Sequence, residues 1–230
     1  MQKRLIIGLV LPAVPSYSET FIWSKIKGLV DQGFSVYLFV NKFDINEESE
    51  ISIPIYPQPQ KEEVFTIILK LTTLFLFNIL RVIRYVRLEK KSNMNWLLVI
   101  KHLIINSHIL NKKLDWLHFG FATMGIQREN VARAIGARSA VSFRGFDIGL
   151  YPHQHPNCYN ILFKRINKVH TISDDLYKKA IELGLDQKVS YVKITPAINA
   201  EFFRSGSLED IHKPLRILTV GRLHWKKGYE

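Results

Sequence analysis

Leu5 to Leu11 reads L-I-I-G-L-V-L, a continuous apolar run of the kind that forms a buried parallel strand. Prolines follow it directly, and Ser16 and Glu19 then stand at capping-box spacing, so we expect a helix to begin near Ser16. Apolar residues recur at helical spacing until Gly33, where the helix should end. Phe34 to Val40 is the next apolar run. This pattern predicts a βαβ unit, whose first strand–helix loop opens at the carboxyl edge of the sheet, where such folds bind ligands.

The same alternation of strands and helices continues along the chain. It predicts an α/β fold with a doubly wound, mostly parallel, Rossmann-like sheet. Pro54 indicates that one short strand lies at a sheet edge. A helix is predicted at 123–135, with Gly136 as its C-cap. The further strands are expected at 51–56, 114–119, 139–143, 168–172 and 189–194.

Leu215 to Gly228 reads L-R-I-L-T-V-G-R-L-H-W-K-K-G and predicts one more buried strand, at 215–220, that runs into a cationic loop. A glycine-punctuated basic loop after a strand is a common way to hold a phosphate, although a solvated basic turn has the same pattern. We therefore expect three parts: a first domain at 1–203, a linker at 204–214, and the opening of a truncated second domain at 215–230.

Composition narrows the class of protein. The chain has 230 residues, of which 47% are hydrophobic and 23% charged, as in a globular protein. Cys158 is its one cysteine, which favours a reducing cytoplasm, and we expect no cleavable signal peptide. The formal charge of +12 indicates an anionic partner. Residues 61–113 hold ten Lys or Arg against three Glu, or +7, among aliphatic residues, which favours a membrane surface over nucleic acid.

Val64 to Arg87 is the most hydrophobic stretch of the chain, and with Met94 to Leu110 it predicts an apolar helical hairpin inserted in the fold. On one straight helix, five basic residues would share an arc of roughly 120°. Such a helix lies on an anionic membrane more readily than across it, although a core helix with its charged stripe in water is the alternative. The predicted membrane-binding stripe consists of Lys70, Arg81, Arg84, Arg87 and Lys91.

Several short motifs, in this order along the chain, resemble family 4 glycosyltransferases of the GT-B fold, in the branch that builds exported bacterial polysaccharides. They are P-S-Y-S-E-T-F-I at 15–22, H-F-G at 118–120, R-G-F-D-I at 144–148, and V-G-R-L followed by K-G at 220–228. The family commonly has histidine where this chain has Arg144. The resemblance implies that Arg222 and Lys227 hold the diphosphate of a nucleotide sugar.

The same resemblance suggests residues for the acceptor or the transferred sugar. Simpler roles are open for some of them: Glu19 as part of the helix cap, and Asp147 as an Asx-type loop hydrogen bond. The candidate contacts are Ser18, Glu19, His118, Arg144 and Asp147. No catalytic residue is assigned.

The resemblance implies a glycosyltransferase of the hexosyltransferase type. It would move a sugar from a nucleotide diphosphate to a lipid-linked or growing polysaccharide, with retention, and this fragment alone would be inactive. No cofactor or metal is expected beside the nucleotide sugar, since His153 and His155 lack further spaced ligands. The expected location is the inner face of the cell membrane. The alternatives are a non-catalytic membrane-surface domain from a truncated gene and another α/β enzyme acting on a sugar phosphate.

Overall fold

The computed structural model describes residues 4–16, 19–42, 52–60, 64–196, 218–221, 223 and 228–229. The chain divides into two compact units, Met1–Ala197 and Ile198–Glu230. Every helix and strand formed by the described residues lies in the first unit.

The predicted strand at 215–220 is described only in part. Residues 218–220 form no strand, and the side chains of Leu218 and Val220 are exposed. Because residues 215–217 lie outside the described residues, the strand and the second domain stay a prediction.

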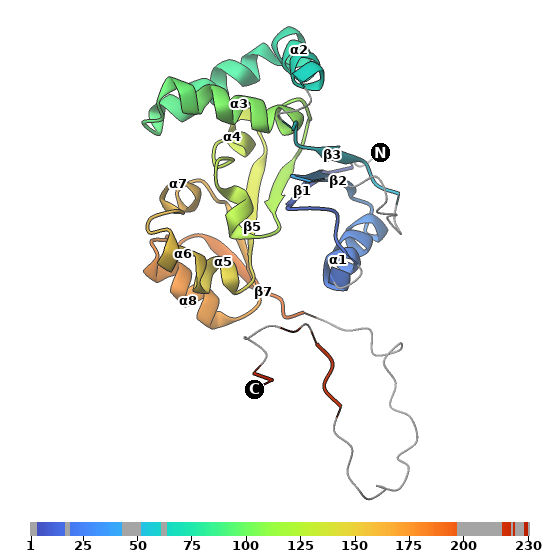
Figure 1. Cartoon of the computed structure of the whole chain (residues 1–230), viewed down its shortest axis with the longest axis vertical. Coiled ribbons are helices and arrows are strands. Elements are labelled where there is room, and N and C mark those ends of the chain that lie inside the picture. Colours follow the sequence, from blue (N-terminus) through green and yellow to red (C-terminus); the bar gives the residue numbers. More distant parts are fainter. Residues whose placement is uncertain are drawn as a thin grey trace, which may run out of the picture. The chain divides into compact units, whose positions relative to one another are not determined.

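The first unit is built on a seven-stranded, wholly parallel sheet with the order β3–β2–β1–β4–β5–β6–β7 (Figure 1). The strands are β1 (Ile6–Leu11), β2 (Ser35–Val40), β3 (Ile55–Pro57), β4 (Trp116–Phe119), β5 (Arg138–Phe143), β6 (Lys168–Thr171) and β7 (Ser190–Lys193). The sequence order reverses between β1 and β4, which pair from Ile7↔Trp116 to Val10↔Phe119. The predicted α/β, doubly wound, Rossmann-like sheet is confirmed, and β3 lies at its edge as Pro54 indicated.

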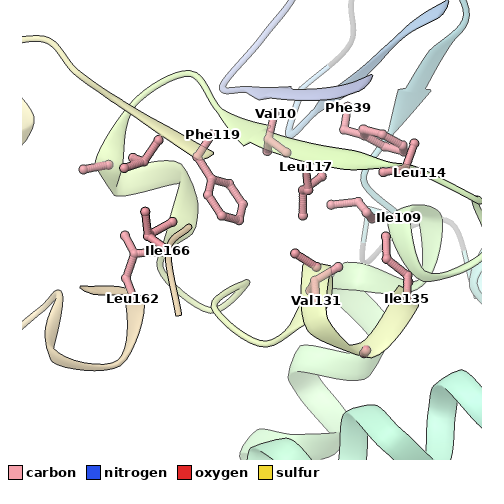
Figure 2. Packing of buried hydrophobic residues seen from close by; sticks show 14 of the residues in the cluster. Val10, Phe39, Ile109, Leu114, Leu117, Phe119, Val131, Ile135, Leu162 and Ile166 are labelled. Atoms are coloured by element: carbon pink, nitrogen blue, oxygen red, sulfur yellow. The ribbon is translucent and has the colours of Figure 1, made fainter. Parts of the chain in front are cut away.

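Both faces of the sheet are covered, because alternate residues of each strand enter different cores. Leu9 and Leu11 of β1 pack with Ile22 and Ile26 of the first helix, whereas Val10 belongs to the larger core on the other face. Figure 2 shows this larger core, in which strand residues such as Val10, Leu117 and Phe119 lie opposite residues from the helical side. The larger core also includes Phe39, Ile109, Leu114, Val131, Ile135, Leu162 and Ile166.

Gly120 ends β4 where the backbones of β1 and β4 approach each other. A Cβ atom there would collide with the side chain of Leu11 and would lie 3.2 Å from the carbonyl oxygen of Val10. The amide of Gly120 donates to that same carbonyl at 2.9 Å. A glycine is therefore required at this point for the chain to leave the sheet beside the end of β1.

The helices follow the predicted pattern with shifted ends. They are α1 (Thr20–Asp31), α2 (Val64–Lys91), α3 (Trp96–Leu110), the 3-10 turn η2 (Ala122–Gly125), α4 (Val131–Ile135), α5 (Phe146–Gly149), α6 (Tyr151–Gln154), α7 (Asn160–Phe163) and α8 (Asp174–Glu182). The predicted helix at 123–135 is instead η2, a turn and the short α4, which ends at Gly136 in the left-handed conformation (φ 78°). Ser173 caps α8, where its hydroxyl accepts from the amide of Leu176.

The predicted hairpin is present but is bent. Helix α2 breaks at Asn78, where φ is −134°, and its two arms, Phe65–Phe77 and Ile79–Lys91, meet at 102°. Among the described residues, no single helix is long and apolar enough to cross a bilayer; the two arms qualify only as a bent pair, by length and composition. Because the helix is not straight, residues on its two arms do not share the single arc assumed above.

Two residues of the predicted basic stripe, Lys70 and Arg81, are partly buried, and a third, Arg84, is exposed but also binds a backbone carbonyl. Lys70 Nζ donates to the Pro57 carbonyl at 3.1 Å, and Arg84 Nη1 donates to that of Ala134 at 3.2 Å. Arg81 Nη1 reaches the carbonyl oxygens of Leu110 and Lys112, at 2.9 and 2.8 Å. The last carbonyls of helices have no partner within the helix and carry partial negative charge, so nearby cations bind them. Arg87 and Lys91 are exposed, as predicted.

A buried polar cluster joins the hairpin to the rest of the unit. Glu89 is 1% exposed, and one of its carboxylate oxygens lies 3.0 Å from His102 Nδ1. The other accepts from Asn130 Nδ2, also at 3.0 Å. A buried carboxylate is stable only with such partners, so this cluster fixes α3 against the second arm of α2 and the turn before α4.

Candidate functional site

A cavity of about 410 Å³ lies at the carboxyl edge of the sheet, on the face covered by α1. Two predicted site residues, His118 and Arg144, line it together with residues from α1, from β6 and from the segment after β7. Open α/β sheets bind ligands at this edge, near the reversal of strand order. The lining residues are Phe21, Ser24, Lys25, His118, Arg144, His170, Ile194, Thr195 and Pro196.

Strand alternation explains why these side chains meet. Leu117, Phe119 and Val169 point into the core on the far face, so His118 and His170 point toward α1. Ser142 of β5 lies between them and is directly paired in register with His170. Lys25 enters from α1, and its Nζ lies 3.1 Å from His118 Nε2.

A chain of hydrogen bonds determines which nitrogen of each histidine ring carries a hydrogen. His170 Nε2 lies 3.2 Å from the carbonyl oxygen of Ile194, which can only accept, so Nε2 carries a hydrogen. Burial, and then Lys25 and Arg144, lower the pKa of His170 to about 4, so the ring is neutral at pH 7. Its Nδ1 therefore accepts from the Ser142 hydroxyl at 2.9 Å. The Ser142 oxygen in turn accepts from His118 Nε2 at 2.8 Å.

Positive groups crowd the cavity. Burial, with a further contribution from Arg144, lowers the pKa of Lys25 to about 7. The pKa of His118 falls well below its usual value, mainly because the ring is buried and also because Lys25, His170 and Arg144 surround it. No Asp or Glu is among the residues that line the cavity. With Lys25 and Arg144 as its basic groups and no carboxylate in its lining, the cavity is suited to an anion.

Arg144 is held at the wall of this cavity by an aromatic ring. Its guanidinium carbon lies 4.5 Å from the centre of the Phe21 ring, a cation–π contact. Its Nε is buried and has no hydrogen-bond partner among the described residues. The stacked guanidinium therefore keeps a donor for a further group.

Asp147, predicted as a sugar contact, has a different place. It is 1% exposed and does not line the cavity. One carboxylate oxygen accepts from the amides of Arg144, Gly145 and Ile148 at 2.9 to 3.1 Å, and the other accepts from that of Ala122 at 2.9 Å. The carboxylate thus holds the loop that positions Arg144, which is the Asx-type role left open above.

Glu19 also has a local role. Its carboxylate accepts from the amide of Ser16 at 3.2 Å, while its own amide donates to the Ser16 carbonyl at 2.9 Å. Glu19 thus makes its half of the predicted capping box, but the N-cap residue of α1 is Glu19, without a side-chain cap hydrogen bond, and the helix begins at Thr20, later than predicted. The other predicted positions, Ser18 and the diphosphate ligands Arg222 and Lys227, lie outside the described residues.

Lys25, Ser142 and His170 were missed from the sequence, although two signals point to them. Lys25 interrupts the apolar positions of α1, since it follows Phe21 by four residues and Ile22 by three. His170 repeats the pattern of His118, since each lies third in a four-residue strand and directly follows a side chain of the far core. A polar residue on the core-facing stripe of an amphipathic element indicates a cavity or a buried partner.

A second cavity, of about 460 Å³, lies between β3, α2 and α3, and its polar groups are largely occupied. Lys70 there binds Pro57, and the ammonium of Lys112 lies 4.0 Å from the centre of the Tyr56 ring. In the part of the chain that the structure describes, no group of three or more His, Cys, Asp or Glu side chains could hold a metal ion. The cationic cavity is therefore the stronger candidate site.

No family model and no curated protein matches this sequence. Among solved structures, HepE from Anabaena, in complex with UDP and glucose, aligns with a TM-score of 0.52 at 10% identity, over 89% of this chain and 48% of that one. Sucrose-phosphate synthase from Thermosynechococcus elongatus aligns with a TM-score of 0.52 at 10% identity, over 87% of this chain and 50% of its own. Both are glycosyltransferases of the GT-B fold. At this identity the likeness establishes the fold, and the chain spans about half the length of these neighbours.

Proposed function

We propose that this chain is the acceptor-binding half of a glycosyltransferase. The reaction moves a sugar from a nucleotide diphosphate to a lipid-linked or growing polysaccharide, with retention at the anomeric carbon. The observation that carries the proposal is the cationic cavity around Lys25 and Arg144, which lies at the ligand-binding edge of a sheet shared with GT-B enzymes. The presence of UDP and glucose in the HepE structure is consistent with a nucleotide-sugar donor.

We assign cations two roles in this sugar transfer. As the glycosidic bond to the donor breaks, negative charge develops on the departing diphosphate, and fixed cations aimed at it lower the barrier. We assign this role to Arg222 and Lys227, on the motif alone. The cavity at Lys25 then serves the acceptor, which must be held with its hydroxyl against the anomeric carbon. No step in this scheme needs a resident metal.

The test is sugar transfer by the protein expressed from its complete reading frame. Radiolabelled nucleotide sugars are incubated one by one with membrane extract, and label is followed into lipid-linked and polymeric fractions. We expect one donor to give labelled product, and Arg144→Gln to reduce it. Failure of every donor to label any fraction would overturn the proposal. Conversion of a free sugar phosphate instead would favour the other α/β enzyme class.

The proposed location is the cytoplasmic surface of an anionic membrane, and the hairpin is its contact. Its two helices carry exposed apolar side chains far beyond the few that a surface usually shows. Between residues 65 and 110 the exposed charged side chains are all basic, while the one acid, Glu89, is buried. The exposed apolar residues are Phe65, Ile68, Leu69, Phe75, Leu76, Phe77, Ile79, Leu80, Ile83, Trp96, Leu97, Leu98 and Ile100.

Such a surface combines shallow insertion of apolar side chains with attraction of about 1 kcal/mol per cation near anionic lipid. Cosedimentation with anionic vesicles should therefore fall as salt rises, because screening weakens the attraction. Phe77→Ser with Leu97→Ser should reduce binding at every salt concentration, whereas Arg87→Gln with Lys91→Gln should reduce its salt dependence. Equal cosedimentation of all three proteins would refute the membrane contact.

A further inference from the structure

The charge of the cavity is not balanced within the described part of the fold. Three cations of the helical hairpin have protein acceptors, since Lys70, Arg81 and Arg84 all donate to backbone carbonyls. At the cavity, the ammonium of Lys25 has a histidine ring as its neighbour, and the side chain of Arg144 has the face of Phe21. Two partly buried cations that share a cavity without an acidic lining residue lower the stability of the fold, so this arrangement requires an explanation.

The donors in the cavity converge. Lys25 Nζ, at 3.1 Å from His118 Nε2, and Arg144, within Coulombic reach of Lys25, line the same 410 Å³ space. Arg144 Nε is buried and unpartnered among the described residues, and the Asp147 carboxylate holds the loop that carries it. An ammonium beside a guanidinium is the donor set that binds oxyanions, with the guanidinium supplying the planar fork.

We propose that this cavity binds a phosphoryl group of the acceptor substrate, with Lys25 and Arg144 as its direct ligands. The assignment of this site to the acceptor rests on the proposed function, whereas the phosphoryl site itself does not. The histidine–serine chain positions the His118 ring, because Ser142 and His170 hold its Nε2–H. The Nδ1 atom of this ring is left to accept and lies 3.5 Å from Lys25 Nζ. A phosphorylated acceptor is the form in which a lipid-linked sugar would present its anion.

Binding should take up a proton. The groups that face Lys25 are His118 from β4, His170 from β6 and Arg144 after β5, and no lining residue is acidic. With the pKa of Lys25 at about 7, most of its amine is neutral at pH 8. A phosphate dianion beside it favours the ammonium, so the amine gains a proton from solvent as the ligand enters. The two histidines stay neutral, because their pKa values lie far lower.

The experiment is isothermal titration calorimetry at pH 8 with inorganic phosphate and with glucose 1-phosphate, in two buffers of different ionisation enthalpy. The difference between buffers reports protons taken up. We expect binding of both probes and uptake of close to one proton. Lys25→Met should weaken binding about ten- to hundredfold and abolish uptake, and Arg144→Gln should weaken it about as much. Lys27→Met, whose ammonium is exposed and paired with Asp31, is the matched control and should change neither.

The possible results separate the phosphoryl site, its assignment to the acceptor, and the proposed function. Absence of phosphate binding at millimolar concentration, or binding that survives both Lys25→Met and Arg144→Gln, overturns the site. UDP that competes with glucose 1-phosphate, through a displacement that Lys25→Met abolishes, assigns the site to the donor diphosphate and overturns the acceptor assignment. Sugar transfer is measured separately, so phosphate binding without transfer by the complete protein refutes the proposed function and leaves the site standing. Circular dichroism of each variant confirms that it is folded.

Discussion

Replacing Lys25 with methionine should stabilise the protein while it destroys the anion site. Methionine keeps the length of the side chain but removes an ammonium that is held beside Arg144 in a partly enclosed cavity. In the folded protein the pKa of Lys25 is about 7, against 10.5 for a free lysine. The folded state therefore disfavours the protonated amine. This lowers the free energy of unfolding at every pH at which the unfolded chain carries the proton.

The magnitude follows from the two pKa values. At about 1.4 kcal/mol for each tenfold change, the shift from 10.5 to about 7 corresponds to roughly 5 kcal/mol at pH 6. Lys25 is only partly buried by surface area, so water in the cavity reduces this cost, and we expect a gain of roughly 2–4 kcal/mol for Lys25→Met. Charged groups placed for ligands commonly carry such a cost in stability.

The lowered pKa of Lys25 also predicts how the stability gain of Lys25→Met depends on pH. Between pH 7 and 10.5 the unfolded chain holds a proton on Lys25 that the folded chain lacks, so the free energy of unfolding of the parent rises with pH in this window. The advantage of Lys25→Met should therefore be full below pH 7 and fade toward pH 10.5. Urea denaturation at pH 6, 8 and 10 measures it, with Lys27→Met as the control, for which we expect a change below about 0.5 kcal/mol. A variant that is less stable than the parent at pH 6, or an advantage that does not change with pH, would refute the reasoning.

Three further predictions concern other basic and acidic residues. In the complete protein, Arg222→Ala and Lys227→Ala should each lower kcat/KM by on the order of 1.5–3 kcal/mol, and Lys226→Ala by much less; equal losses from all three would indicate a general basic patch. Arg81→Gln should lower the free energy of unfolding by about 1–3 kcal/mol, because two helix-end carbonyls lose their donor; an unchanged urea midpoint would contradict the inward contact. Asp147→Asn should cost about 2–4 kcal/mol and weaken phosphate binding, because an amide cannot accept all four backbone hydrogen bonds; normal stability would argue against the loop role.

The sheet could be predicted because its strands are buried on both faces. Parallel strands such as β1 and β2 read as unbroken apolar runs, which few other structures produce. Helix ends were less predictable, since they depend on local hydrogen bonds: α1 begins at Thr20, although its capping pair begins at Ser16. Short helices such as α4 offer too few residues for a periodic signal.

The direction of the basic stripe could not be predicted from periodicity. A helical wheel gives the relative angle of side chains on a straight helix, and Asn78 breaks α2 between Lys70 and the arginines. The helical wheel also carries no information about which carbonyls of other elements need a donor. Arg81 and Arg84 bind carbonyls near the ends of α3 and α4, which are far away from them in the sequence.

The two kinds of buried or partly buried cation in this protein call for different explanations. Where the fold itself supplies an acceptor, as at Lys70 or Arg81, a structural role accounts for the positive charge, and net charge alone is then poor support for an anionic partner. At Lys25 and Arg144 the described fold supplies a histidine ring and an aromatic face; no carboxylate lines the cavity, and the nearby Asp147 is occupied by backbone amides. The free energy spent in placing two cations together is recovered only when an anion enters. The charge that bears on function is therefore that of these two residues, and it predicts a ligand at the carboxyl edge of the sheet.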